Sequence, residues 1–458
     1  MLLTFVDRDP ELSGLDDQYK KKRAGLFILY GRRRIGKTTL AKKFAESKPS
    51  FYFLAKRQDL SLELERLRES FSEEFDIFIE KSEDLDGFFK NVIDRIEFED
   101  KFVFIIDEFP YWIEENKSIL SEMQHLWDER LKDENIFLIL TGSSIGMMET
   151  KVLNYKSPIY GRRTGQLKLN EMPISALKNF LPSYSYEDLI RTYGALGAIP
   201  FYLKEFDDEK GFFKNIETTF FNNLNILYEE AEILLREELR KPNVYFNMIK
   251  AIIDGATKLS EISSESHVSV TNVNKYLNVL ERLEIIEREY PVTESAKKKN
   301  FHYRVTDNYF RFWLSFVYPN QGNIEENSKN IVKKVKKDYD HFMGPVFEEV
   351  CDMYVKKNRD YDKVGKWWYK ENEIDVVGLN EEKDKMLLGE CKWSKKTVGQ
   401  GLYHKLKEKE EKIRWKNDDR QVEYILFSRS GFDEDLYSLA EDDLSLVDLE
   451  DLWYGFEH

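Results

Sequence analysis

The stretch Gly31-Arg32-Arg33-Arg34-Ile35-Gly36-Lys37-Thr38 decides the fold of the first part of this chain. It matches the pattern G-x-x-x-x-G-K-[ST], in which glycines let the backbone bend so that successive N–H groups point at phosphate oxygens. Lys37 can reach the β- and γ-phosphates, and the Thr38 hydroxyl can bind Mg²⁺. The pattern therefore predicts a phosphate-binding loop. The residues expected around the phosphates are Gly31, Arg34, Ile35, Gly36, Lys37, Thr38 and Thr39.

The two segments that flank this loop fit it. Residues 24–30 form a short apolar run, which is typical of a buried strand, and residues 39–44 have the pattern of a helix. The positive amino-terminal end of that helix favours a bound anion. This context favours a phosphate-binding loop over a glycine-rich surface loop that happens to contain a lysine.

A second apolar run, residues 101–106, ends in two carboxylates, Asp107 and Glu108. This is the form of a Walker B strand. Asp107 is expected to hold Mg²⁺ through water, and Glu108 to orient or deprotonate the attacking water. The alternative is a buried strand followed by an acidic loop.

Two further segments are candidates for contact with the γ-phosphate. The apolar run 136–140 ends in small hydroxyl residues, of which Ser143 is expected between the phosphate-binding loop and the Walker B strand. Arg162 and Arg163 follow a glycine turn, and either they stabilise charge on the transferring phosphoryl group or they are solvated surface charges. The sequence has no N-K-x-D guanine-reading motif, so we expect ATP rather than GTP.

Composition narrows the class of protein. The chain has 458 residues, a length that predicts several folded domains, and its net charge is −15. It has two cysteines, too few for a framework of disulfides, so we expect a reducing cytoplasm. No apolar run approaches the ~18 residues of a spanning helix, so no membrane segment is expected. The negative charge argues against a protein that coats nucleic acid indiscriminately, so any contact between this chain and nucleic acid should be local.

Several segments together resemble a known family, the archaeal-type ATPases of the STAND branch of AAA+ proteins. They are residues 5–12, the phosphate-binding loop, 105–110, 140–144, 160–164 and 194–203. The resemblance implies an adenine pocket near Val6 and Arg8, closed by a helical lid around Pro200. The chain departs from the family at Asp7 and at Ala198, where glycines are usual, which puts the contacts with the base in doubt.

The middle third predicts a winged helix, because three helical segments precede a basic hairpin. Its third helix has apolar residues at the period of one buried face. Residues Thr271, Asn272, Asn274 and Lys275 would project from it towards double-stranded DNA, and the hairpin residues 297–299, all lysines, would meet phosphates. The alternative is a winged helix that only packs domains together.

The order of elements in the last third resembles that of the PD-(D/E)xK nucleases. The resemblance implies that Asp375 and Glu390 bind Mg²⁺, and that Glu348 is a third carboxylate. Lys392 lies two residues after Glu390 on the same face of its strand, where it could activate water or stabilise phosphate charge. The alternative is a retained fold in which these carboxylates merely pair with lysines.

We therefore predict an α/β protein with five segments: a P-loop ATPase core (1–170), a helical lid (171–240), a winged helix (241–320), a linker or connecting helix (321–342) and a nuclease-like domain (343–458). The expected function is ATP binding and hydrolysis, with Mg²⁺, that controls the two C-terminal modules on DNA. One alternative is a nucleotide-dependent signalling switch whose nuclease-like domain is inactive and binds protein. Another is a Mg²⁺-dependent nuclease with largely structural ATP. The sequence leaves the oligomeric state open.

Overall fold

The computed structural model describes residues 6–95, 100–239, 241–294, 300–416, 420–439 and 443–458. The chain divides into two compact units. The first comprises Met1–Met172 with Ile199–Phe201, and the second comprises Pro173–Ala198 with Tyr202–His458. In the part of the chain that is described, no helix is both long and apolar enough to span a membrane.

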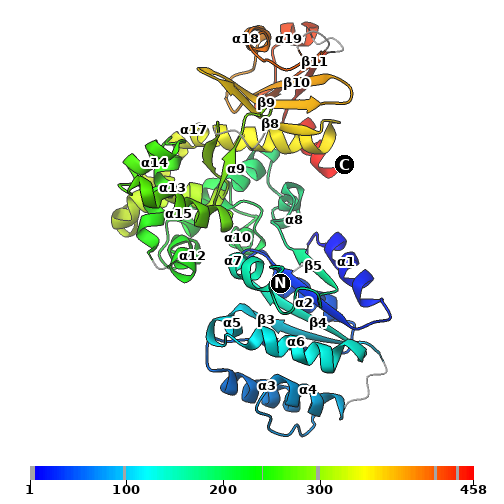
Figure 1. Cartoon of the computed structure of the whole chain (residues 1–458). Coiled ribbons are helices and arrows are strands. Elements are labelled where there is room, and N and C mark those ends of the chain that lie inside the picture. The colour runs from blue at the N-terminus through cyan, green and yellow to red at the C-terminus, as the bar shows by residue number, and fades with distance from the viewer. Residues whose placement is uncertain (1–5, 96–99, 240, 295–299, 417–419, 440–442) are drawn as a thin grey trace. The chain divides into compact units, whose positions relative to one another are not determined.

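The first unit is built on a parallel sheet, of which Figure 1 labels β3, β4 and β5. Its strand order is β2-β3-β4-β1-β5. Every residue of β1, β3 and β4 is buried, which is why these strands are continuous apolar runs in the sequence. The strands are β1 (Gly25–Tyr30), β2 (Ser50–Leu54), β3 (Phe102–Asp107), β4 (Ile136–Gly142) and β5 (Gly165–Lys168).

Helices cover both faces of this sheet. One face packs against α3, α4 and α6 through an aromatic core that includes Phe71, Phe88 and Phe104. The other face packs against α1 and α2 through Leu15, Leu40 and Phe44. The helices of this unit are α1 (Asp9–Tyr19), α2 (Lys37–Ala45), α3 (Leu60–Phe75), α4 (Leu85–Ile93), α5 (Pro110–Glu115), α6 (Ile119–Glu129) and α7 (Ile145–Met147). The observed fold is thus a layered α/β fold in which the three central strands β1, β3 and β4 are fully buried.

The second unit begins with helices and ends with a second sheet. Its first helices are α8 (Leu177–Phe180), α9 (Tyr186–Leu196), α11 (Phe212–Thr219) and α12 (Glu230–Glu238), and α10 (Pro200–Leu203) crosses from one unit to the other. Three helices and a two-stranded antiparallel sheet then occupy the segment for which the sequence predicts a winged helix. They are α13 (Pro242–Ile253), α14 (Leu259–Glu265), α15 (Val270–Arg282), β6 (Ile286–Glu289) and β7 (His302–Val305).

A long helix, α17 (Ile324–Asn358), follows α16 (Asn308–Phe312). It includes most of the predicted linker 321–342 and continues past residue 343, where the sequence places the start of the last domain. The inner side of its first half is buried at Ile331, Val335 and Tyr339. The predicted linker is therefore part of a packed helix, and its many charged residues lie on the exposed face of that helix.

The second sheet has the order β12-β11-β10-β9-β8 and contains both parallel and antiparallel strands. Figure 1 labels β8 to β11. Strands β8, β9 and β10 are antiparallel, whereas β10, β11 and β12 are parallel. One face packs against α17 and the other against α18. The elements are β8 (Lys363–Tyr369), β9 (Asn372–Asn380), β10 (Lys385–Lys392), α18 (Gln400–Glu410), β11 (Gln421–Ser428), α19 (Glu434–Leu439), β12 (Leu444–Val447) and α20 (Leu449–Glu457).

Candidate functional site

The phosphate-binding loop joins the end of β1 to the start of α2. Gly31 has φ of 151°, and a Cβ there would lie 2.3 Å from the Leu169 carbonyl oxygen, so only glycine fits. Gly36 caps α2 in the left-handed region at φ of 95°, and Arg34 is also left-handed at 71°. The sequence thus places its two motif glycines where the backbone conformation requires them.

The Lys37 ammonium is folded back onto this loop. It donates to the carbonyl oxygen of Gly31 at 3.0 Å and to that of Arg32 at 2.7 Å, and the residue is 4% exposed. The Ile35 side chain is buried in the core below, so only its backbone is available to a phosphate. Thr39 is exposed on the first turn of α2.

The Walker B carboxylate lies beside the loop. Asp107 ends β3 and is 2% exposed. It accepts hydrogen bonds from the hydroxyls of Thr38 at 2.7 Å, Tyr52 at 2.6 Å and Thr141. Oxygen atoms of a carboxylate and a hydroxyl at this contact are the donor set that Mg²⁺ takes in proteins, so the residues present fit that cation.

Glu108, the next residue, adopts a left-handed conformation with φ of 56°, which is uncommon for a glutamate. Its carboxylate accepts hydrogen bonds from the Ser143 backbone N–H at 3.1 Å and from the Ser143 hydroxyl. Ser143 can do this because β4 lies between β1 and β3 in the sheet. The strand order therefore places a hydroxyl beside the candidate catalytic base.

Of the two residues predicted to line the adenine pocket, Arg8 contacts the phosphate-binding loop. Arg8 is buried, donates to the Asn170 carbonyl at 2.8 Å and to the Ile35 carbonyl at 3.4 Å, and pairs with Glu11 at 2.7 Å. Val6 is half-buried just before it. Arg8 thus supports the loop from beneath through backbone carbonyls.

Pro200 begins α10 within the three-residue segment that belongs to the first unit. The neighbouring Phe201 ring lies 4.0 Å from the Arg34 guanidinium of the loop. Pro200 therefore lies one residue from a side chain that contacts the phosphate-binding loop, and Arg34 is engaged with that aromatic ring.

Arg162 and Arg163 lie at the amino end of β1, whereas the phosphate-binding loop follows its carboxyl end. The hydroxyl of Thr164, the next residue, accepts a hydrogen bond from the backbone N–H of Leu26 at the start of β1, at 3.1 Å. Arg162 makes a two-pronged ion pair with Asp128, with contacts of 3.1 and 2.8 Å. Both arginines line a cavity of about 440 Å³ there. In parallel strands the amino ends share one edge and the carboxyl ends the other. The structure therefore does not bring these arginines to the loop of their own chain, which the catalytic alternative would require within one chain.

In the second unit, Asp375 and Glu390 converge on one lysine. The Lys392 ammonium lies 3.6 Å from Asp375 Oδ2 and 3.1 Å from Glu390 Oε2. Asp375 on β9 also accepts the Cys391 backbone N–H at 2.9 Å, and Lys409 from α18 pairs with the second oxygen of Glu390. The carboxylates raise the pKa of Lys392 although burial opposes this.

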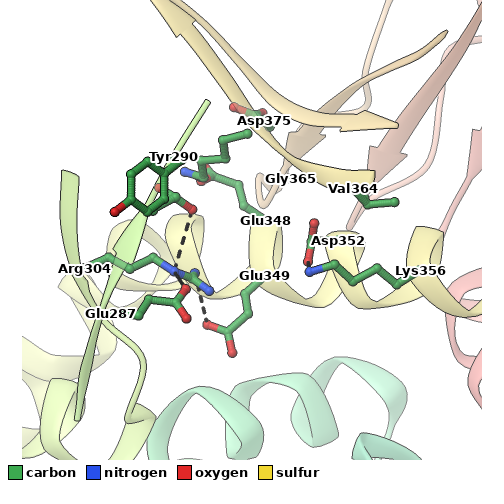
Figure 2. Close-up of a pocket in the computed structure, with 12 residues that line it drawn as sticks. Glu287, Tyr290, Arg304, Glu348, Glu349, Asp352, Lys356, Val364, Gly365 and Asp375 are labelled. Carbon is green, nitrogen blue, oxygen red and sulfur yellow. Dashed lines mark hydrogen bonds and ion pairs between the residues drawn. The ribbon is translucent and has the colours of Figure 1, made fainter. Parts of the chain in front are cut away.

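Glu348 makes a separate pair with the Lys366 ammonium, at 2.5 Å. Both residues and Asp375 line a cavity of about 150 Å³ between the β6–β7 hairpin, α17 and the strands β8 and β9 (Figure 2). Burial raises the pKa of the Glu348 carboxyl, with a further contribution from Asp375, while Lys366 opposes it. Glu390 is not part of this lining.

The predicted magnesium cluster of Glu348, Asp375 and Glu390 is therefore not assembled as expected. Among the residues that the structure describes, no three histidines, cysteines or acidic residues are grouped so that they could hold a metal ion. Lysines hold the carboxylates instead, because a buried carboxylate is stable only where a cation offsets its charge.

Comparisons with known proteins bear on both units. Residues 5–206 match a family model described as an ATPase domain predominantly from Archaea. Residues 313–412 match a family of archaeal and bacterial proteins of unknown function. The chain is 35% identical to the protein MJECL04 of Methanocaldococcus jannaschii over 417 residues, which cover 88% of this chain and 92% of that protein.

The chain belongs to the same family as MJECL04, and its residues 5–206 are an archaeal ATPase domain. A Walker-type ATPase of Pyrococcus abyssi has a similar fold, with a TM-score of 0.51 at 21% identity over 68% of this chain and 96% of that one. An ATP-binding protein of M. jannaschii, MJ0423, is 51% identical over 47 residues, which are 10% of this chain and 80% of that protein. These comparisons confirm two predictions from the sequence, namely that the chain has an ATPase domain and that this domain is of an archaeal type.

Outside the ATPase domain, the β6–β7 hairpin packs against the last sheet. The Val292 N–H donates to the Lys366 carbonyl at 2.9 Å, and the rings of His302 and Trp368 stack at 4.5 Å. This hairpin therefore covers the edge strand β8, which the sequence did not predict. The lysines at 297–299 lie outside the described residues.

Arg304 on β7 is the charged centre of this contact (Figure 2). It pairs with Glu287, with Glu289 at 3.6 Å and with Glu349 of α17 at 3.8 Å. Burial opposes its charge, but these carboxylates raise the pKa of the guanidinium. Glu349 also accepts the Tyr193 hydroxyl of α9 at 2.7 Å, so one buried carboxylate joins α9, the hairpin and α17.

Replacing Arg304 with methionine should destabilise the second unit by about 3 kcal/mol, because it leaves several partly buried carboxylates without their cation. The urea midpoint of unfolding measures this. The control is Arg236→Met, since the Arg236 side chain is 68% exposed and its pair with Glu232 should contribute at most about 1 kcal/mol. Equal midpoints for the two variants would show that the hairpin contact is weak.

Sequence reasoning missed three residues of these sites: Tyr52, Lys366 and Lys409. Tyr52 is one aromatic residue among several in β2, and Lys366 and Lys409 lie in segments rich in lysine. Their pairing with Asp107, Glu348 and Glu390 depends on contacts between elements that are distant in the chain. No local signal singles them out.

Proposed function

We propose that this chain binds ATP with Mg²⁺ at the first unit and hydrolyses it to ADP and phosphate. The observation that carries the proposal is the Thr38–Asp107 contact of 2.7 Å beside Glu108. Lys37 and the loop N–H groups would bind the phosphates, and Thr38 and Asp107 would hold Mg²⁺, which offsets phosphate charge when bound. The archaeal ATPase family match supports the same assignment.

In the proposed reaction Glu108 accepts a proton from water as the water oxygen attacks the γ-phosphorus. The bond from that phosphorus to the bridging oxygen then breaks, and ADP leaves. Ser143, which now donates to Glu108, would orient the carboxylate towards the water.

The test is phosphate release from ATP by the purified chain, with Mg²⁺ and after chelation with EDTA. Release that requires Mg²⁺ is expected. A protein that neither releases phosphate nor gains thermal stability with ATP would refute the proposal. Plasmid DNA in the same reactions tests cleavage by the same preparation.

We further propose that α15 contacts double-stranded DNA and that ATP controls this contact. Thr271, Asn272, Asn274 and Lys275 are all exposed on one helix, where polar side chains can reach base edges and phosphates. The competing role, packing of the second unit, is supported by the docked hairpin.

If the lysines at 297–299 meet phosphates, replacing all three with alanine should lower the slope of log affinity against log salt by roughly 2.7. Fluorescence anisotropy of a labelled duplex at several salt concentrations measures this. A matched control replaces Lys333, Lys334 and Lys337, which are exposed on α17. An equal change of slope in both variants would mean that the hairpin has no specific role.

A second candidate function is Mg²⁺-dependent cleavage of DNA by the second unit. Its support is the convergence of Asp375 and Glu390 on Lys392 at one face of a mixed sheet. A metal ion would have to displace Lys392 and Lys409 from these carboxylates, so cleavage would need DNA or nucleotide to rearrange the site. Lys392 would then stabilise charge on the phosphate while water adds to phosphorus and one ester oxygen leaves.

For this candidate, Asp375→Ala should abolish Mg²⁺-dependent nicking of plasmid DNA, because the carboxylate shared with the Cys391 N–H and Lys392 disappears. Glu381→Ala is the control, since Glu381 lies exposed just after β9 and pairs only at the surface with Lys363. Nicking that survives Asp375→Ala is contamination. No nicking by any form of the protein would favour the third reading, a nucleotide-dependent switch that binds protein.

A further inference from the structure

Tyr52 is a feature of the nucleotide site that no sequence motif marks. It lies on β2, opposite Ile105 of the Walker B strand, and its phenol donates to Asp107 Oδ2 at 2.6 Å. The same oxygen accepts the Thr38 hydroxyl at 2.7 Å, and Thr141 donates to Oδ1. Asp107 is thus held by hydroxyls from β2, α2 and β4.

In this contact the phenol is the donor, because a carboxylate oxygen can only accept. The Lys42 ammonium of α2 lies over the face of the ring, 3.9 Å from its centre. Tyr52 is therefore a fixed donor with a fixed ring position.

A carboxylate that binds a metal is oriented by the groups that donate to it, and loss of such a donor typically weakens metal affinity or activity by about 10–100-fold. At Oδ2, Thr38 cannot supply this orientation alone, because its oxygen is itself a candidate Mg²⁺ ligand, and Thr141 donates to the other oxygen, Oδ1. We propose that Tyr52 is a positioning residue for Mg²⁺ at the ATP site, where its hydroxyl fixes the rotation of the Asp107 carboxylate. This inference rests on the ATP binding proposed above.

The test is Tyr52→Phe, which removes one oxygen and keeps the ring. The affinity for a fluorescent ATP analogue is measured in EDTA and across a Mg²⁺ titration. We expect unchanged affinity in EDTA, and a roughly 10-fold increase in the Mg²⁺ concentration that half-saturates the gain in affinity. The Mg²⁺ dependence of ATP hydrolysis should shift in the same direction.

The matched control is Tyr19→Phe, which removes a phenol that donates at 2.7 Å to the Lys101 carbonyl in the same unit. It should lower the thermal midpoint without moving the Mg²⁺ dependence. If Tyr52→Phe only lowers the midpoint in the same way, Tyr52 is structural and the inference is wrong. If the unsubstituted protein binds no nucleotide in either condition, the proposed ATPase function fails and this inference fails with it.

Discussion

Replacing Glu108 with glutamine should slow ATP hydrolysis by roughly 10²–10⁴-fold while ATP still binds, because the amide cannot accept the proton of the attacking water. Glutamine is close in shape to glutamate, so the contact with the Ser143 N–H can persist through the amide oxygen. Single-turnover hydrolysis and equilibrium binding of an ATP analogue separate the two effects.

The control is Glu115→Gln at the end of α5, an exposed carboxylate that should change neither quantity. The left-handed conformation of Glu108 is unaffected by this design, since glutamine faces the same backbone strain as glutamate. A Glu108→Gln protein that hydrolyses ATP at the original rate would exclude Glu108 as the base. Loss of binding together with hydrolysis would assign it to nucleotide binding.

Replacing Lys37 with alanine should weaken ATP binding itself, by roughly 10²–10⁴-fold. A lysine that contacts two phosphates makes two charge-assisted bonds of about 1.5–3 kcal/mol each, and alanine loses both. The loop also loses the contacts from the ammonium to the Gly31 and Arg32 carbonyls, so its conformation without nucleotide should loosen. Equilibrium dialysis or fluorescence binding measures the affinity.

The matched control is Lys43→Ala on the same helix, where the side chain is exposed and pairs with Glu46. Its effect on affinity should be small. ATP binding that is equally weak in both variants would point to damage to α2. Unchanged binding in the Lys37 variant would contradict the assignment of the loop.

The Lys37→Ala and Glu108→Gln variants also distinguish the roles of these two residues. Lys37 stabilises bound ATP, whereas Glu108 stabilises the transition state. Only the Lys37 variant should therefore lose affinity for ATP, and both variants should hydrolyse ATP more slowly. Tyr52 should differ from both, because its loss changes the Mg²⁺ dependence and leaves binding in EDTA intact.

The sequence by itself determined the order of the elements in the ATPase domain. The strand before the loop, the glycines at Gly31 and Gly36, and the strand that ends at Asp107 are local features. Their causes, apolar burial and backbone conformation, act over a few residues. The sequence also placed Asp375 and Glu390 on two successive strands, and side-chain alternation put Glu390 and Lys392 on one face of the second strand.

Only the tertiary structure decided which of these residues meet. Arg162 and Arg163 follow a glycine turn as predicted, but the parallel strand order puts them at the amino edge, away from the loop. Glu348 lies on the expected helix, yet Lys366 of β8 takes its carboxylate. Tyr52 reaches Asp107 because β2 pairs with β3. Such pairings depend on the packing of distant elements and on the need to offset buried charge, and no local pattern encodes either.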